Sequence, residues 1–147
     1  SKLKTKFSNN IRNNFGFMNR FDEDGVGQPD KLFRQQGRKV FKEVCPMAAA
    51  MIRATVEGVG LQIEDISRFW LHQANLSMNQ LITRTLLGRD ATPEEAPVIL
   101  DTYANTSSDG STIAFHSYQD DLASGSHGVI CSFGAGYSIG CVVVRKL

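Results

Sequence analysis

The sequence predicts an α/β fold in which helices cover a single mixed sheet. Short apolar runs of strand length alternate along the chain with segments whose apolar residues recur at helical spacing. The last two apolar runs are joined only by a glycine-rich turn, so they are expected to pair antiparallel, which makes the sheet mixed. A chain of 147 residues suits one domain with one hydrophobic core.

Four apolar runs are predicted as strands, at residues 68–71, 98–100, 129–133 and 138–145. The last run contains Val142, Val143 and Val144. Three consecutive β-branched apolar residues are typical of a central buried strand.

Two helices are predicted from periodicity. Residues 38–59 have the spacing of an amphipathic helix with one wide apolar face. Pro46 lacks a backbone donor, so we expect it to kink this helix or to mark a fresh first turn. Residues 76–87 also have helical spacing, and Gly88 stands where a C-terminal glycine belongs.

Two shorter helices are predicted from capping signals. Residues 92–95 form a capping-box pattern with proline at the first helical position, so a short helix should begin there and end at Pro97. Ser107 or Ser108 can cap another helix, which should run to about Ala123.

Composition limits the classes of function. The charges nearly cancel, with 16 Lys and Arg against 15 Asp and Glu, so a nucleic-acid partner is not expected. Membrane association and export are not expected either, because no apolar run approaches the length of a membrane span and no leader pattern opens the chain. Cys45, Cys131 and Cys141 form an odd set without a CxxC motif, which favours reduced thiols in a cytoplasmic protein.

Residues 1–36 are predicted to be an irregular lead-in, because glycine and asparagine are frequent there and the apolar residues show no pattern. The lysines and arginines of this segment have two interpretations. They fit a solvent-exposed lead-in, which we favour, or a basic surface that binds an acidic partner. The predicted globular domain is therefore residues 37–147.

His72 is the first candidate for chemistry. It follows the apolar run 68–71, with the amides Gln73 and Asn75 beside it, and Asn105 follows the run 98–100. Strand ends are where α/β proteins place their sites, so His72 and Asn105 could converge on one cleft. A neutral imidazole N–H and an amide N–H would be two donors for a developing oxyanion. The alternative is a structural histidine. A metal site is not expected, because the histidines lack ligand spacing.

The second candidate is the glycine loop Phe133-Gly134-Ala135-Gly136. Dinucleotide binding is rejected, because the loop lacks the G-x-G-x-x-G spacing and leads into a strand instead of a helix. A plain hairpin turn and a turn that exposes a backbone N–H to a ligand both remain open. No nucleophile is identified from the residues.

The motifs at residues 72–75, 105–107 and 133–136 together resemble the C-terminal half of β-ketoacyl-acyl-carrier-protein synthase III, a condensing enzyme of the thiolase superfamily. The resemblance covers residues 37–147 and implies one thiolase-like αβα half. It implies decarboxylative Claisen condensation of an acyl-CoA with a malonyl thioester in fatty acid biosynthesis. The alternatives are a specialised acyl-CoA condensing enzyme of secondary metabolism and a non-catalytic binding or dimerisation domain.

The resemblance also implies roles for single residues. His72 and Asn105 would be catalytic donors, while the nucleophilic cysteine belongs to an N-terminal half that this chain lacks, so the isolated chain should be inactive. The full-length enzyme would be a homodimer with no cofactor, and acyl-CoA and a malonyl-carrier protein would be its substrates.

Further residues would bind substrate or carrier. Phe133, Gly134, Ala135, Gly136 and Asn75 would contact the substrate, with the Ala135 N–H in an oxyanion site and Phe133 in the wall of the acyl tunnel. The chain departs from the family in having Ser77 where many members have a basic residue that docks the carrier protein. Arg84 on the same predicted helix could substitute.

Overall fold

The computed structural model describes residues 2–3, 11–12 and 34–147. Within the predicted lead-in, the described residues form three two-residue strands, β1 (Lys2–Leu3), β2 (Ile11–Arg12) and β3 (Arg34–Gln35), followed by Gln36. The rest of that prediction lies outside the described residues.

The main sheet is mixed, as predicted. Its strand order is β1-β6-β5-β4, built from β4 (Ile66–Leu71), β5 (His127–Gly134) and β6 (Ser138–Arg145) with β1 at one edge. Strands β4 and β5 run parallel, whereas β6 is antiparallel to β5. A separate pair joins β2 to β3.

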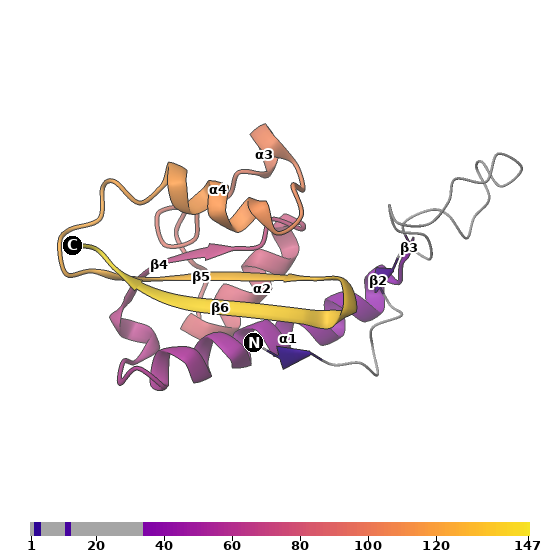
Figure 1. The fold of residues 1–147 in the computed structure, drawn as a ribbon, viewed down its shortest axis with the longest axis horizontal. Helices are drawn as coiled ribbons and strands as arrows, with labels where there is room; N and C mark the ends of the chain where they lie inside the picture. The colour runs from indigo at the N-terminus through magenta and orange to yellow at the C-terminus, as the bar shows by residue number, and fades with distance from the viewer. Residues whose placement is uncertain (1, 4–10, 13–33) are drawn as a thin grey trace, which may run out of the picture.

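Helices cover both faces of this sheet (Figure 1). The helices α1 (Gly37–Glu57) and α2 (Leu76–Leu87) pack together on one face, and the short helix η4 (Ile63–Asp65) links α1 to β4. The other face carries α4 (Asp109–Ser117), with α3 (Leu100–Tyr103) beside it in the same layer (Figure 1). The 3₁₀ turn η5 (Ala135–Tyr137) connects β5 to β6.

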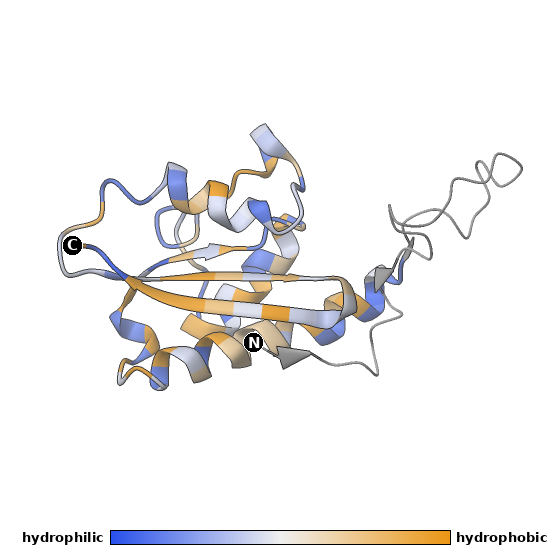
Figure 2. Cartoon of the chain, viewed as in Figure 1, coloured by the Kyte–Doolittle hydropathy of each residue, from blue (hydrophilic) through white to orange (hydrophobic). Residues whose placement is uncertain are grey.

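The α1 helix supplies much of the core. Apolar and polar residues alternate along this helix (Figure 2). Its buried apolar residues belong to one core cluster with residues of β4, β5 and β6. Val40, Val44, Ala48 and Ile52 are at most 1% exposed, which defines the buried stripe. The helix continues through Pro46 as one element, so the predicted fresh first turn at this residue is wrong. No helix in the described part of the chain is long and apolar enough to cross a membrane.

The predicted strand at residues 98–100 is wrong. Leu100 begins α3, and the backbone N–H of Ile99 donates to the Gln73 side chain at 3.2 Å instead of to a strand. The edge of β4 is met instead by Glu95, whose carbonyl accepts from the Phe69 N–H at 2.7 Å. Such a single contact does not make a strand pair.

The predicted helix at residues 92–97 is only one turn. The capping box forms, because the Thr92 N–H donates to the Glu95 carboxylate at 2.9 Å and the Glu95 N–H donates to the Thr92 hydroxyl at 3.3 Å. One further bond, from the Ala96 N–H to the Thr92 carbonyl, closes the turn at 3.0 Å. Pro97 follows directly and cannot donate to a second turn.

The α4 helix ends at Ser117, short of the predicted Ala123. The carbonyl of Tyr118 accepts from Arg68 Nη1 at 2.7 Å and from Trp70 Nε1 at 3.1 Å. Two side chains from β4 therefore take the carbonyl that would otherwise serve a continuing helix.

The prediction that residues 142–144 form a central buried strand is also wrong in part. Strand β6 does lie inside the sheet order, but β1 pairs only with Ser138 and Ile139. Val142 is 56% exposed, and the pairing with β1 does not extend to it. Val144 packs on the cluster around Trp70.

Candidate active site

His72 lies just beyond the end of β4, where the strand pairing with β5 continues by one hydrogen bond. Its backbone N–H donates to the Cys131 carbonyl at 2.8 Å. The side chain is 6% exposed, and its ring centroid lies 4.5 Å from that of Phe133. The imidazole is therefore fixed by its backbone and by a ring contact from the neighbouring strand.

Burial determines the charge of this imidazole. Desolvation lowers the pKa of His72 from 6.5 to about 4, because the charged form loses its hydration in the buried position. The ring is therefore neutral at pH 7 and carries one N–H. A neutral imidazole can donate a hydrogen bond without adding a cation to the site.

Ser132 is a contact that sequence reasoning missed. Its hydroxyl oxygen lies 3.2 Å from Nδ1 of His72. The parallel register pairs Leu71 with Cys131, so the next residue of each strand, His72 and Ser132, are neighbours. Ser132 directly precedes the glycine loop, but the sequence alone does not reveal which strands pair or in which register.

Asn105 lies in a loop with unusual backbone angles. Its neighbours Ala104 and Ser107 have φ of 54° and 61°, a region that non-glycine residues rarely adopt. The Asn105 side-chain oxygen accepts from the Ser107 backbone N–H at 2.9 Å. This turn engages the oxygen of the amide and leaves its NH₂ group to donate.

Gln73 holds the chain that leads to Asn105. Its side-chain nitrogen donates to the carbonyls of Leu71 at 2.9 Å and Pro97 at 3.4 Å, and its oxygen accepts from the Ile99 N–H at 3.2 Å. Gln73 is fully buried. A methyl group on Gly110, in the first turn of α4, would lie 2.8 Å from its Cβ. Gln73 thus ties the end of β4 to the segment before α3 and to the start of α4.

These elements enclose a cavity of about 260 Å³. His72 and Asn105 both line it, so the structure brings the two predicted donors to one opening. Three residues of the predicted glycine loop line it as well, Phe133, Gly134 and Ala135. The other lining residues are Gln35, Val40, Ala74, Met78 and Ser107.

Two predicted substrate contacts lie outside this lining. Asn75 caps α2, its side-chain oxygen accepting from the Met78 N–H at 3.0 Å. Gly136 has φ of 73° and forms the turn between β5 and β6 together with Tyr137, whose φ is 52°. These contacts account for both residues structurally, and their binding to substrate remains a prediction.

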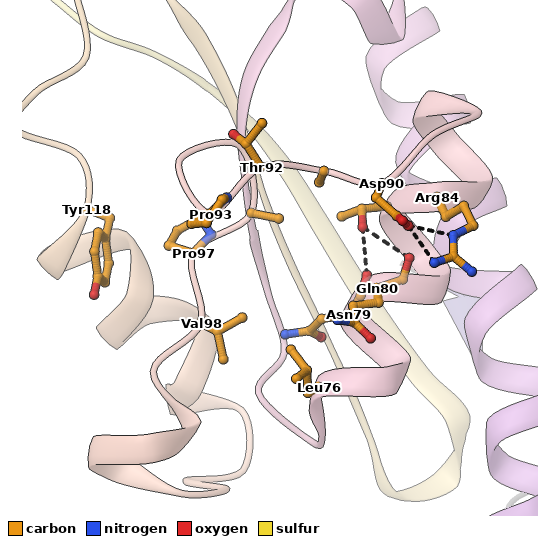
Figure 3. Close-up of a pocket in the computed structure, with 13 residues that line it drawn as sticks. Leu76, Asn79, Gln80, Arg84, Asp90, Thr92, Pro93, Pro97, Val98 and Tyr118 are labelled. Atoms are coloured by element: carbon orange, nitrogen blue, oxygen red, sulfur yellow. Dashed lines mark hydrogen bonds and ion pairs between the residues drawn. The ribbon is translucent and has the colours of Figure 1, made fainter.

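Arg84 lies at a different cavity, of about 440 Å³, between α2 and the loop 90–98 (Figure 3). Its guanidinium pairs with Asp90 at 2.5 Å. Pro93, Pro97 and Val98 give this cavity an apolar side (Figure 3). Docking of a carrier protein by Arg84 remains a prediction, with the observed ion pair as its structural role.

The three cysteines do not line the His72 cavity. Burial raises the pKa of Cys45 to about 11, which disfavours a thiolate there. Cys131 and Cys141 face each other across β5 and β6, and their hydrogen bond raises the pKa of Cys131 and lowers that of Cys141. Among the described residues, no three His, Cys, Asp or Glu side chains gather as a metal site would require.

Comparison with known proteins identifies the family. The family model described as "3-Oxoacyl-[acyl-carrier-protein (ACP)] synthase III C terminal" matches residues 56–146. The β-ketodecanoyl-[acyl-carrier-protein] synthase of Pseudomonas aeruginosa is 66% identical over 146 residues, covering 99% of this chain and 42% of that protein. The β-ketoacyl-[acyl-carrier-protein] synthase III of Brucella canis is 31% identical over 114 residues, covering 76% of this chain and 34% of that protein.

The fold leads to the same family. The crystal structure of β-ketoacyl-[acyl-carrier-protein] synthase III from Thermus thermophilus superposes with a TM-score of 0.79 at 25% identity, covering 99% of this chain and 44% of that one. The architecture is therefore thiolase-like, and the chain spans less than half the length of these relatives. The chain belongs to the 3-oxoacyl-[acyl-carrier-protein] synthase III C-terminal family.

Proposed function

We propose that this chain is the C-terminal part of an acyltransferase that condenses an acyl-CoA with a malonyl thioester and releases CO₂. The observation that carries the proposal is the cavity shared by His72 and Asn105. The first is a neutral imidazole and the second an amide whose oxygen is already engaged, so both are suited to donate to one oxygen atom.

The proposed chemistry uses these donors when negative charge develops. In the malonyl thioester, the bond between the methylene carbon and its carboxylate breaks, CO₂ leaves, and the electron pair becomes an enolate on the thioester. Hydrogen bonds from His72 and Asn105 would stabilise the enolate oxygen. The enolate carbon would then attack the carbonyl of an acyl-cysteine and expel the cysteine thiolate.

The nucleophilic cysteine of this proposal lies outside the 147 residues. Support comes from the cavity, whose lining residues do not include Cys45, Cys131 or Cys141. A cysteine from the remainder of the protein would reach the cavity from its open side. The proposal therefore requires both parts of the protein for turnover.

The acyl group is proposed to have eight carbons. The 66% identical relative is a β-ketodecanoyl synthase, so its product has ten carbons, of which a decarboxylated malonyl unit would supply two. The first substrate that we propose is therefore a medium-chain acyl-CoA. We further propose that the full-length enzyme is a cytoplasmic homodimer and that it acts in fatty acid biosynthesis.

The second candidate is an acyl-CoA condensing enzyme that does not use a carrier protein, and Ser77 favours it. Ser77 is exposed in the first turn of α2 and offers no cation to an acidic carrier protein, while Arg84 on the same helix pairs with Asp90. Competition between malonyl-CoA and malonyl-carrier protein for the acylated enzyme distinguishes the two candidates.

The experiment that tests the proposed roles uses the full-length protein and separates its two half-reactions. His72→Ala and Asn105→Ala should each lower the rate of condensation about a hundredfold or more, because each removes one oxyanion donor. Acylation by octanoyl-CoA, followed by mass spectrometry, should be much less affected. His127→Ala is the matched control, because His127 starts β5 at the opposite end of the sheet.

Near-normal condensation by both variants would refute the assigned roles. Failure of the unmodified full-length protein to form a β-ketoacyl product from any acyl-CoA and malonyl thioester would refute the proposed reaction itself.

A further inference from the structure

We propose that Ser132 is a positioning residue that selects the tautomer of His72 in which Nε2 carries the proton. The inference rests on the proposed function, in which His72 donates to the substrate. It adds Ser132 as a residue that holds the His72 ring without contacting the substrate. It starts from one contact, between the Ser132 hydroxyl oxygen and Nδ1 of His72 at 3.2 Å.

The imidazole has little freedom to turn away from this contact. The His72 backbone is bonded to the Cys131 carbonyl at 2.8 Å, and the Phe133 ring lies against the imidazole with centroids 4.5 Å apart and planes tilted by 53°. Three consecutive residues of β5 therefore fix the backbone, one ring nitrogen and one face of His72. Ser132 is not among the residues that line the cavity, whereas His72 is, so the Ser132 hydroxyl engages Nδ1 and leaves Nε2 without this contact.

The remaining ring nitrogen, Nε2, is the one left for a ligand. A neutral imidazole has one N–H, so Nε2 can donate only when Nδ1 is an acceptor. Ser132 makes Nδ1 an acceptor when its hydroxyl donates to it. An oxyanion next to Nε2 requires this arrangement, because an unprotonated Nε2 would direct a lone pair at a negative charge.

The Ser132 hydroxyl has a second acceptor within reach. The carbonyl of Ser108 lies 3.4 Å from the same oxygen, slightly farther than Nδ1 of His72. If the hydroxyl donated to Ser108, its oxygen would accept from Nδ1–H and the tautomer would be reversed. The orientation of one hydroxyl thus decides whether His72 donates or accepts in the cavity.

Three substitutions in the full-length protein separate this role from packing. Ser132→Thr keeps the hydroxyl, Ser132→Val has the shape of threonine without it, and Ser132→Ala removes it with minimal change in volume. We expect Ala and Val to lower kcat for condensation about five- to tenfold, the loss of one hydrogen bond, with KM for the malonyl thioester nearly unchanged. Threonine should retain most of the activity. Ser67→Ala is the control, because Ser67 is exposed at the far end of β4.

Nitrogen-15 NMR of histidine-labelled protein reads the tautomer directly. The His72 signals are assigned by their loss in His72→Gln. Unmodified protein and Ser132→Thr should show an unprotonated Nδ1 and a protonated Nε2, and Ser132→Ala and Ser132→Val should shift protonation toward Nδ1.

The outcomes are distinguishable. Equal kcat losses for Thr and Val, or the same His72 nitrogen shifts in all four proteins, would overturn the role of Ser132 and show that only packing matters there. The NMR result does not depend on substrate, so it tests Ser132 even if the proposed condensation is not observed.

Discussion

The charge of His72 follows from where its ring lies. The ring is buried against Phe133 at the end of β4, and desolvation lowers its pKa to about 4. The proposed donor is therefore neutral throughout the range in which the enzyme would work. Its N–H proton is available for a hydrogen bond, and the imidazole adds no positive charge to the cavity that it lines.

A consequence is an acid-sensitive contribution to stability. As pH falls, His72 in the unfolded chain becomes protonated at its ordinary pKa of 6.5, whereas in the folded chain its pKa is lowered to about 4. The free energy of unfolding should therefore fall between these values by up to about 3 kcal/mol from this group, and should be insensitive to it above pH 7. Urea unfolding of unmodified protein and His72→Gln from pH 7 to 4.5 measures the effect. Parallel pH dependences of the two proteins would contradict it.

At the scale of single residues, the sequence indicates which side chains are candidate donors. It does not indicate which other side chains hold them in place. His72 and Asn105 could be predicted because each is a polar side chain with unusual local context and a family resemblance. The contact of Ser132 with His72 depends on strand register, which no local pattern reveals. Gln73 was visible as a neighbour of His72, but its bonds to Pro97 and Ile99 are long-range contacts.

Strand β4 lies at the edge of the sheet, and a loop instead of another strand meets its outer side. The Phe69 N–H donates to the carbonyl of Glu95, while Arg68 donates to the carbonyls of Glu94 and Tyr118 and pairs with Asp121. Local apolar content predicted a strand at 98–100, yet Pro97 and the Gln73 side chain redirect that segment. Helical spacing predicted α1 and α2, because each buries one apolar face, and apolar runs predicted β4, β5 and β6.

The packing of β4, β5 and α4 around Trp70 gives a prediction for this layer. A methyl group on Gly128 would lie 2.2 Å from Trp70 Cζ3, and Trp70 is held by its bond to Tyr118 and an edge contact with Phe115. Gly128→Ala should therefore destabilise the protein by about 1–3 kcal/mol through overpacking. Thermal unfolding measures the loss.

Gly140→Ala is the control for that measurement. Gly140 lies in the neighbouring strand β6, and nothing lies within 4 Å of a methyl group added there. Its free energy of unfolding should change by less than about 0.5 kcal/mol. Equal stability of the two variants would show that Trp70 yields freely.

The whole molecule brings three distant segments to one cavity. His72 comes from the end of β4, Asn105 from the loop between α3 and α4, and residues 133–135 from the end of β5 and the start of the turn that follows it. The chain corresponds to 42% of the length of its 66% identical relative, and the proposed nucleophile belongs to the remainder. Inactivity of the isolated chain stays a prediction of this arrangement.

A double-substitution cycle on the full-length, acylated enzyme tests most directly whether His72 and Asn105 serve one oxygen. Decarboxylation of the malonyl thioester is measured for the unmodified protein, His72→Ala, Asn105→Ala and the double variant. Donors to a shared oxyanion should be coupled, so the double variant should lose less than the two single losses added, by at least about 1 kcal/mol. Additive losses, within about 0.3 kcal/mol, would mean that the two side chains act at separate places.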